Sequence, residues 1–567
     1  MKNKSTQLAS RSWPLGLKMV ACLLSTLLFL YAVPTNVFAE LIDAIDTATD
    51  SNDEQTTIEE TESGKEGTVF EVIDRREETV KHFRTEDGSF TAVQYNVPVH
   101  EKDENGEWQD IDNTLSESGS EYATSNARVK FAKKTTGNST LFTLHDGNRK
   151  ITMSLSGANK KVAGHVTNTQ TEFPEDATQL QKMMTLDKLS SKILYPEILE
   201  GVDLEYVVNS CNIKENIIVK ERADSYSYTF EIQLNNLEAV LCEDGSVAIS
   251  DPDTDEVVYT IPKGYMFDAD GEYSDAVEYT LTNGGNGKYS LTVTADAEWI
   301  NTEGRAFPVT VDPPINVTTD ASSMIDTYVS QSSPNGTFYS ITQLRVGYSG
   351  NNEYRAFWKV NTLPEFPENT YLIKASFMMD CLYTGAPNTH TFATKIGVYG
   401  MSSSNWTTGM TWNNRNNYFI ADVDNIIDYR DIPAATSTSS TNWISWDITS
   451  LYMQWLSDPS SNHGLALASI DDVKKDYAVF SSANSTAYIP CIIIEYRDMK
   501  GVESYWSTSS HSAGLAGNGY VNHATGDLVF SVGTLTTTDG LFGYTPSIIY
   551  NSAISEDYYY SGDNDNV

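Results

Sequence analysis

Apolar and polar residues alternate along most of the chain between residues 67 and 498, in short runs such as those beginning at Val69, Tyr226 and Lys288. A period of two places successive side chains on opposite faces of a β-strand. Turn-forming Asp-Gly pairs separate the runs, for example at Asp146-Gly147 and Asp270-Gly271. Short strands at roughly ten-residue spacing are typical of β-sandwiches, so the pattern predicts an all-β fold.

Helical periodicity is scarce. Residues 182–191 favour one short helix, and a second begins at Asp447 or Thr449, either of which can cap it. Asp458-Pro459 ends this second helix. Its apolar residues fall on one face, where we expect Trp455 to point inward. We also expect Trp358, in an alternating strand, to lie in the core.

Composition divides the chain into five segments. They are a signal peptide (1–39), an acidic disordered linker (40–66), a β-rich N-terminal region of one or two domains (67–315), a β-sandwich (316–498) and a Gly-, Ser- and Tyr-rich final segment that we interpret as incomplete (499–567). Within the last segment, residues 519–522 and 525–530 predict a hairpin.

Export is the prediction that the N-terminus supports. Lysines and arginines precede an apolar run, Met19–Val33, and the small residues Val37 and Ala39 follow it at signal-peptidase spacing. The alternative is an uncleaved anchor. No other apolar run is long enough to span a bilayer, so we expect a secreted or extracellular protein with no membrane span after signal removal.

The formal net charge is −39, and residues 1–39 carry no acidic residue. That much negative charge repels nucleic acid, so we predict no nucleic-acid partner. The four cysteines after the signal segment, Cys211, Cys242, Cys381 and Cys491, match no zinc or redox spacing. One or two disulfides and four idle thiols are both compatible with them. The oligomeric state stays open.

Catalytic motifs are absent from the sequence. It has no Gly-x-Ser-x-Gly elbow, no His-Glu-x-x-His run and no Gly-rich phosphate loop. We therefore predict a protein without enzymatic activity. The alternative is a secreted glycan-degrading enzyme with a site in 67–315, which needs a cleft with paired carboxylates of split pKa.

Six of the ten tryptophans lie between residues 358 and 455. Trp406 and Trp412 stand in Ser-, Thr-, Asn- and Gly-rich sequence, which favours exposure over core packing. Exposed aromatic rings stack on the apolar faces of sugars. We therefore name Trp406, Trp412 and the neighbouring Tyr399 as candidate glycan-binding residues.

A set of motifs in residues 319–498 occurs in the same order as in a known family of domains. They are Asp326–Val329, Leu344–Gly347, Tyr354–Val360, Val398-Tyr399, Trp406, Thr411–Asn413, Trp446–Thr449, Trp455, Asn462–Leu467, Phe480–Ser482, Pro490 and Tyr496. This segment resembles the DNRLRE domain of bacterial exported proteins, which implies a jelly-roll-like β-sandwich related to carbohydrate-binding modules. One departure is Arg415-Asn416 in place of the usual proline. A structural Ca²⁺ is compatible with such a sandwich, although no ligands can be named.

Residues 501–552 resemble the segment that introduces RHS/YD-repeat shells in wall-associated proteins, through Gly501–Trp506, Gly514–Asn522, Thr525–Leu528 and Tyr550–Ser552. Residues 190–312 resemble the N-terminal part of the same proteins. The resemblance implies a cell-wall or extracellular polysaccharide as partner, bound through the DNRLRE-like module. The alternative is a structural stalk or adhesin without glycan affinity. No YD-repeat array is present, so shell and toxin functions are not assigned.

Overall fold

The structure is a computed structural model that describes residues 70–551 with gaps. The gaps are residues 86–88, 104, 137–139, 170–177, 185, 313–315, 318–324, 340, 368–369, 385–393, 404–405, 408, 420–424, 434–441, 471–475, 487, 499–506, 514–516, 524–527, 534–536, 540–541 and 545–546. The predicted signal peptide and acidic linker lie outside the described residues.

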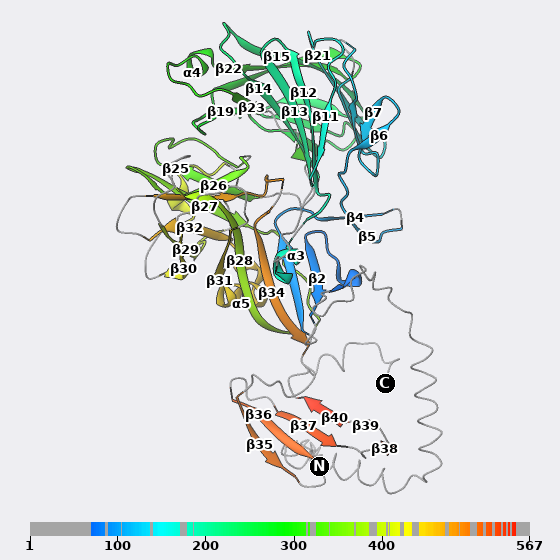
Figure 1. Ribbon diagram of the computed structural model, residues 1–567, viewed down its shortest axis with the longest axis vertical. Helices are drawn as coiled ribbons and strands as arrows, with labels where there is room; N and C mark the ends of the chain where they lie inside the picture. Colours follow the sequence, from blue (N-terminus) through cyan, green and yellow to red (C-terminus); the bar gives the residue numbers. More distant parts are fainter. Residues whose placement is uncertain are drawn as a thin grey trace, which may run out of the picture. The chain divides into compact units, whose positions relative to one another are not determined.

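The predicted all-β fold is confirmed, because strands form nearly all of the regular structure (Figure 1). The chain divides into two compact units. One comprises residues 62–366 and 372–497, and the other comprises residues 1–61, 367–371 and 498–567.

Thirteen strands of the first unit form one sheet that folds over itself as a sandwich. In spatial order they are β1 (Phe70–Glu71), β2 (Val80–Arg84), β3 (Phe90–Tyr95), β34 (Cys491–Asp498), β28 (Thr370–Thr384), β33 (Tyr477–Ser481), β26 (Gln343–Ser349), β27 (Asn352–Lys359), β32 (Leu465–Ser469), β29 (Thr394–Gly400) and β30 (Ile426–Ile432), with β25 (Ile325–Ser330) paired to β27 and β31 (Trp443–Asp447) paired to β28. The long strand β28 pairs with β31 through Ser376–Asp380 and with β33 through Cys381–Thr384. Strands from both ends of this path share one buried core, which contains Trp358, Trp446 and Trp455.

Strand β3 pairs with a strand of the sandwich, although the sequence placed the start of the sandwich at residue 316. It pairs antiparallel with β34 from Phe90 opposite Tyr496 to Tyr95 opposite Cys491, and Figure 1 shows these blue and orange strands side by side. Ala92 lies in the sandwich core, and Val93 lies in a second core on the other face. The sandwich therefore includes residues 70–95, which cover an edge of β34 that would otherwise be open.

The chain between β3 and β25 contributes what we call the inserted lobe, residues 116–312. One of its sheets has the order β21 (Val277–Gly285), β22 (Lys288–Ala295), β15 (Tyr226–Asn235), β10 (Arg149–Leu155), β9 (Phe142–Asp146), β8 (Val129–Ala132), β7 (Glu121–Ala123) and β6 (Ser116–Ser118). The other has the order β11 (His165–Asn168), β12 (Ser190–Leu199), β13 (Val202–Asn209), β14 (Asn212–Val219), β23 (Val309–Asp312), β19 (Tyr265–Phe267) and β20 (Tyr273–Ser274). Both sheets contribute to one hydrophobic core.

Smaller elements complete the described chain. In the first unit they are a ribbon of β4 (His100–Lys102) and β5 (Trp108–Asp110), and a sheet of β16 (Glu238–Leu241), β17 (Val247–Ser250), β18 (Val257–Ile261) and β24 (Asn316–Val317). The same unit contains the helices α3 (Gln179–Met183), α4 (Ala297–Ile300) and α5 (Thr449–Ser457). The second unit has a sheet of β35 (Thr508–Ser512), β36 (Asn518–Asn522), β37 (Leu528–Gly533) and β40 (Ser547–Asn551), and a separate pair of β38 (Thr537–Asp539) and β39 (Phe542–Tyr544). The pairing of β36 with β37 confirms the predicted hairpin.

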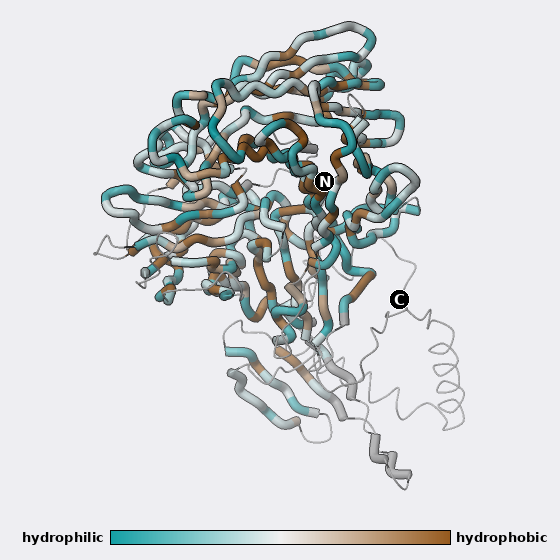
Figure 2. The backbone as a smooth tube through the Cα atoms, turned by 45° about the horizontal axis from the view of Figure 1, so that its top comes forward, coloured by the Kyte–Doolittle hydropathy of each residue, from teal (hydrophilic) through white to brown (hydrophobic). Residues whose placement is uncertain are grey.

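The alternation that predicted the strands is visible in Figure 2, where hydrophobic and hydrophilic segments succeed one another along them. Helix α5 is confirmed, and Trp455 is buried as expected. The predicted cap is wrong, because Ile448 holds the N-cap position without a side-chain hydrogen bond, although Asp447 Oδ1 accepts the Thr449 N–H at 2.9 Å. Trp358 is buried as well. The other predicted helix is displaced, because α3 ends at Met183 and β12 already begins at Ser190.

Candidate functional site

The three predicted glycan-binding residues lie together, but inside the protein. Tyr399, Trp406 and Trp412 are 2%, 1% and 8% exposed and share a small core beside β29 and β32. Trp406 Nε1 donates to the carbonyl of His463 at 2.8 Å, and the Tyr399 ring meets that of Phe419 edge-on at 5.2 Å. The polar sequence around them therefore does not place these rings at the surface. This corrects the expectation of an exposed stacking platform, and their role in glycan binding stays a prediction.

Arginine side chains close off the remaining face of Trp412. The guanidinium carbon of Arg415 lies 3.4 Å from the ring centroid, and that of Arg355 lies at 5.4 Å. Arg355 is held by an ion pair with Glu353 at 2.7 Å. Burial, and then the charge of Arg355, lower the pKa of Arg415. Arg415 is the residue found in place of the proline that the DNRLRE resemblance implied, and its cation lies on the ring.

Several of the ordered motifs serve the framework of the sandwich. Asp326 Oδ2 accepts the Ala483 N–H at 2.6 Å, and burial raises the pKa of this carboxyl to about 7. Asn462 donates to the carbonyl of Val360 at 3.0 Å. Gly464 has φ +88°, and a Cβ there would lie 2.7 Å from the Trp358 carbonyl oxygen. These residues hold strands and loops of the sandwich in register.

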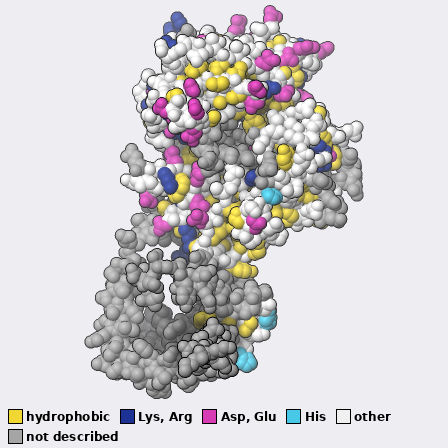
Figure 3. All heavy atoms as spheres, turned by 180° about the vertical axis from the view of Figure 1, so that it is seen from behind, with side chains coloured by type: hydrophobic (Ala, Val, Ile, Leu, Met, Phe, Trp, Pro, Cys, Tyr) yellow, Lys and Arg dark blue, Asp and Glu magenta, His cyan; other side chains and the backbone are white. Residues whose placement is uncertain are grey.

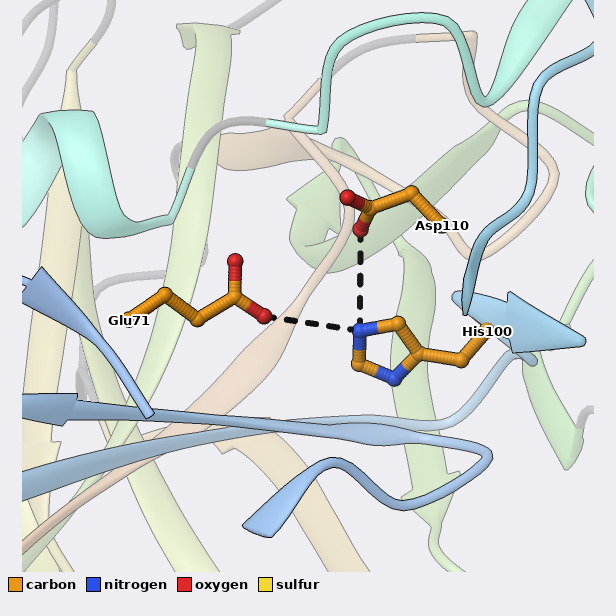
Figure 4. A group of neighbouring side chains, drawn as sticks. All are labelled: Glu71, His100 and Asp110. Carbon is orange, nitrogen blue, oxygen red and sulfur yellow. Dashed lines mark ion pairs between the residues drawn. The ribbon is translucent and has the colours of Figure 1, made fainter. Parts of the chain in front are cut away.

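A charged cluster joins strands β1, β2, β4 and β5. His100 is buried, and its Nε2 faces Glu71 Oε1 and Asp110 Oδ1, each at 3.6 Å (Figure 4). Its Nδ1 lies 2.5 Å from the backbone carbonyl oxygen of Glu77, which can only accept a hydrogen bond. The Nδ1 atom therefore carries the hydrogen and donates it to that carbonyl. A histidine oriented in this way beside two carboxylates offers the donor set that zinc prefers. Among the described residues this is the grouping with the spacing of a metal site.

Two cations already occupy that cluster. Arg76 Nε lies 2.8 Å from Glu71 Oε1, and Lys81 Nζ contacts Asp110 Oδ1. A divalent ion would meet these two fixed positive charges, so the residues do not fit a metal. Burial raises the pKa of Glu71, but His100, Arg76 and Lys81 together lower it to about 2. We assign the cluster as an ion-pair network that ties β1 to its neighbours. It lies outside residues 319–498, where calcium stays a prediction.

Buried carboxylates in the inserted lobe bear on the alternative of a glycan-degrading enzyme. Glu215 is 2% exposed, and burial raises its pKa to about 8. Asp312 is fully buried beside Lys214 at 2.5 Å, and burial raises the pKa of that carboxyl too. Both shifts have the same sign, and neither group lies open to a sugar-sized ligand. This pair therefore does not meet the requirement of a cleft with split pKa values.

The surface carries the acidic character that the sequence predicted. On the face drawn in Figure 3, Asp and Glu side chains are more widespread than Lys and Arg. Cys211, Cys242, Cys381 and Cys491 are free thiols. No helix within the described part of the chain combines the length and apolar character needed to cross a membrane.

An all-β protein built on an aromatic-rich sandwich is the class that these features define, an architecture shared with many lectin-like domains. Sequence comparison agrees with that class. Residues 317–496 match the sequence profile of carbohydrate-binding module family 96. The match covers the sandwich strands from β25 to β34 and leaves out β1–β3, which complete the sheet.

Curated relatives align with more of the chain. The tRNA nuclease WapA of Bacillus subtilis strain 168 is 27% identical over 525 residues, which cover 85% of this chain and 21% of that protein. The tRNA3(Ser)-specific nuclease WapA of Bacillus spizizenii is 27% identical over 466 residues, covering 77% and 18%. A wall-associated protein of Geobacillus stearothermophilus is 24% identical over 215 residues, covering 37% and 79%. The chain thus spans about a fifth of the length of the WapA relatives.

These relatives overturn one prediction and weaken another. The prediction of a protein without enzymatic activity is wrong by this comparison, because relatives that align with most of the chain are named as tRNA nucleases. The predicted exclusion of nucleic acid is weakened by the same names. The motifs sought in the sequence were the serine-hydrolase elbow, the zinc-protease run and the phosphate loop, and none of these is a test for a nuclease.

Proposed function

We propose that this chain binds cell-wall or extracellular polysaccharide through its sandwich and so associates with the bacterial cell surface. The match of residues 317–496 to a carbohydrate-binding family carries the proposal. The wall-associated relative from Geobacillus stearothermophilus supports the location. The DNRLRE and RHS resemblances and the export signal are consistent with the same role and stay part of the proposal.

Co-sedimentation of the purified chain tests the proposal. The chain, expressed without residues 1–39, is mixed with insoluble peptidoglycan sacculi, cellulose, chitin and insoluble polygalacturonate, and bound protein is measured in each pellet. Specific binding to at least one polymer, saturable and absent from a silica control, supports the proposal. A folded chain that pellets with none of them contradicts it and favours a stalk or adhesin without glycan affinity.

Cleavage of tRNA is the second candidate function, favoured by the names of the two WapA relatives. The net charge of −39 opposes approach of a polyanion, so the assay uses physiological salt with Mg²⁺ to screen that repulsion. Incubation with total tRNA followed by a denaturing gel decides the matter. Discrete fragments that grow with time support this function, and intact tRNA at high enzyme concentration contradicts it.

A further inference from the structure

A cavity of about 400 Å³ lies between the inserted lobe and the sandwich. Strands β12 and β14 of the lobe contribute Lys192 and Asn216 to its wall, and strands β26 and β28 of the sandwich contribute Gln343 and Tyr383. Its volume lies within the range of about 300–1,000 Å³ that is typical of small-molecule sites. The cavity is therefore large enough for a short run of sugar rings, and neither wall can form it alone.

Direct contacts hold the two walls together. Tyr273 of the lobe donates to the carbonyl of Thr337 at 2.7 Å and packs against the ring of Phe338 at 4.4 Å. Arg345 of the sandwich donates to the carbonyl of Gly271 at 3.2 Å. These contacts join segments on either side of the cavity, so its opposing walls have a defined separation.

The charges in the wall compensate one another. Lys192 pairs with Glu205 at 3.4 Å, and Lys214 pairs with the buried Asp312 at 2.5 Å. Asp268 pairs with Arg305 at 2.9 Å. Arg345 and Asp270 also line the cavity, so its lining holds three positive side chains (Lys192, Lys214 and Arg345) and three negative ones (Glu205, Asp268 and Asp270). The cavity therefore presents hydrogen-bonding groups without a strong net field. Such a wall does not select a phosphate or a polyanion, which need uncompensated positive charge.

Half-buried aromatic side chains supply the other property that a sugar site needs. Tyr383 and Phe267 line the cavity and remain partly exposed. Rings of this kind cover the apolar faces of sugars, while amide and ammonium groups such as Gln343 and Lys192 hydrogen-bond to their hydroxyls. In contrast, the face of Trp412 is occupied by Arg415.

We propose that this cavity is the glycan site of the chain and that it takes a neutral oligosaccharide segment held by both the sandwich and the inserted lobe. The proposal rests on the polysaccharide-binding function proposed above and names its site. It implies that binding depends on residues outside the segment that matches the carbohydrate-binding family.

The test measures binding of the whole chain and of cavity variants to each polymer of the co-sedimentation panel. Tyr383→Ala removes the aromatic surface from the sandwich wall, and Lys192→Ala removes a hydrogen-bond donor from the lobe wall. Lys192 is largely exposed, so its replacement leaves the fold intact. Two exposed residues that do not line the cavity give matched controls, Tyr429→Ala on β30 and Lys395→Ala on β29.

We expect the chain to bind a neutral polymer, with a loss of at least tenfold for Tyr383→Ala and several-fold for Lys192→Ala, and no change for the controls. Unchanged binding by both cavity variants overturns the cavity as the site and leaves the polysaccharide-binding function standing. Binding to polygalacturonate alone overturns the neutral class of ligand. If the unmodified chain binds nothing, this inference and the proposed function both fail.

Discussion

Gln94 links strand β3 to the rest of the sandwich through its side-chain amide, and Gln94→Ala tests that linkage. The side chain is fully buried. Its Oε1 accepts the Tyr452 hydroxyl at 2.8 Å, and its Nε2 donates to the Thr362 carbonyl at 2.6 Å. Alanine leaves the buried Tyr452 hydroxyl without a hydrogen bond, whereas Thr362 is exposed and its carbonyl can bond to water. The orphaned hydroxyl costs about 1–3 kcal/mol and the vacated volume adds a cavity term, so we expect the free energy of unfolding to fall by about 3 kcal/mol.

Urea and thermal unfolding of the full chain, followed by tryptophan fluorescence, measure this effect. Six of the ten tryptophans lie between residues 358 and 455, so the signal reports mainly on the sandwich. A loss of about 3 kcal/mol lowers the midpoint by roughly 6–12 °C for a domain of this size. The matched control is Gln109→Ala on β5, where the side chain is exposed and the change should stay within about 0.5 kcal/mol.

A double-mutant cycle with Tyr452→Phe separates the hydrogen bond from the space that alanine leaves. We expect the double variant to be more stable than the sum of the single effects, by about 1 kcal/mol, since both singles break the same contact. A sandwich transition that Gln94→Ala leaves unchanged would refute the reasoning, because residues 70–95 would then not belong to the sandwich in solution.

Three further predictions concern charge and burial. Burial raises the pKa of Glu215 from 4.5 to about 8, so the contribution of this carboxyl to stability is present below pH 4.5 and is lost as the pH rises to 8. Glu215→Gln should therefore raise the melting temperature by several degrees at pH 8.5 and change it little at pH 5. Equal effects at the two pH values would contradict the assignment. The pKa of Glu71 is lowered to about 2, so the contribution of this carboxylate to stability is present above pH 4.5 and is lost as the pH falls toward 2. Acid titrations followed by circular dichroism should show Glu71→Gln to be less stable than the unmodified chain at pH 6. The difference between the two proteins should shrink toward pH 2. Arg415→Ala should uncover the Trp412 ring and increase acrylamide quenching, whereas Trp412→Ala should lower stability by about 3 kcal/mol; unchanged quenching would show that Arg415 does not cover the ring.

Local patterns predicted the strands, helix α5 and the burial of Trp358 and Trp455, because alternation and capping are recorded within a few residues of each element. The pairing of β3 with β34 could not be predicted in this way, since its partners lie about 400 residues apart and each strand alternates normally by itself. A polar Gln94 within the apolar run around Val93 and Tyr95 was a local sign that this strand meets polar partners on one of its faces.

The candidate site shows the opposite limit of sequence reasoning. Ser, Thr and Asn around Trp406 and Trp412 suggested exposure, yet both rings are buried in a small core with Phe357 and Phe419. Arg415 was visible as a departure from the expected pattern, but its position on the ring follows from the turn at residues 411–415. The cavity combines residues from Lys192 to Tyr383, and no linear motif joins them.

An adsorption isotherm of the full chain on purified peptidoglycan sacculi, taken at low and high salt, tests the central claim most directly. A glycan site made of aromatic rings and compensated charges predicts saturable binding that persists in 1 M NaCl, since about 3 Å of Debye screening removes only ionic adsorption. Binding that never saturates, or that high salt abolishes, would contradict the claim that this chain recognises wall polysaccharide.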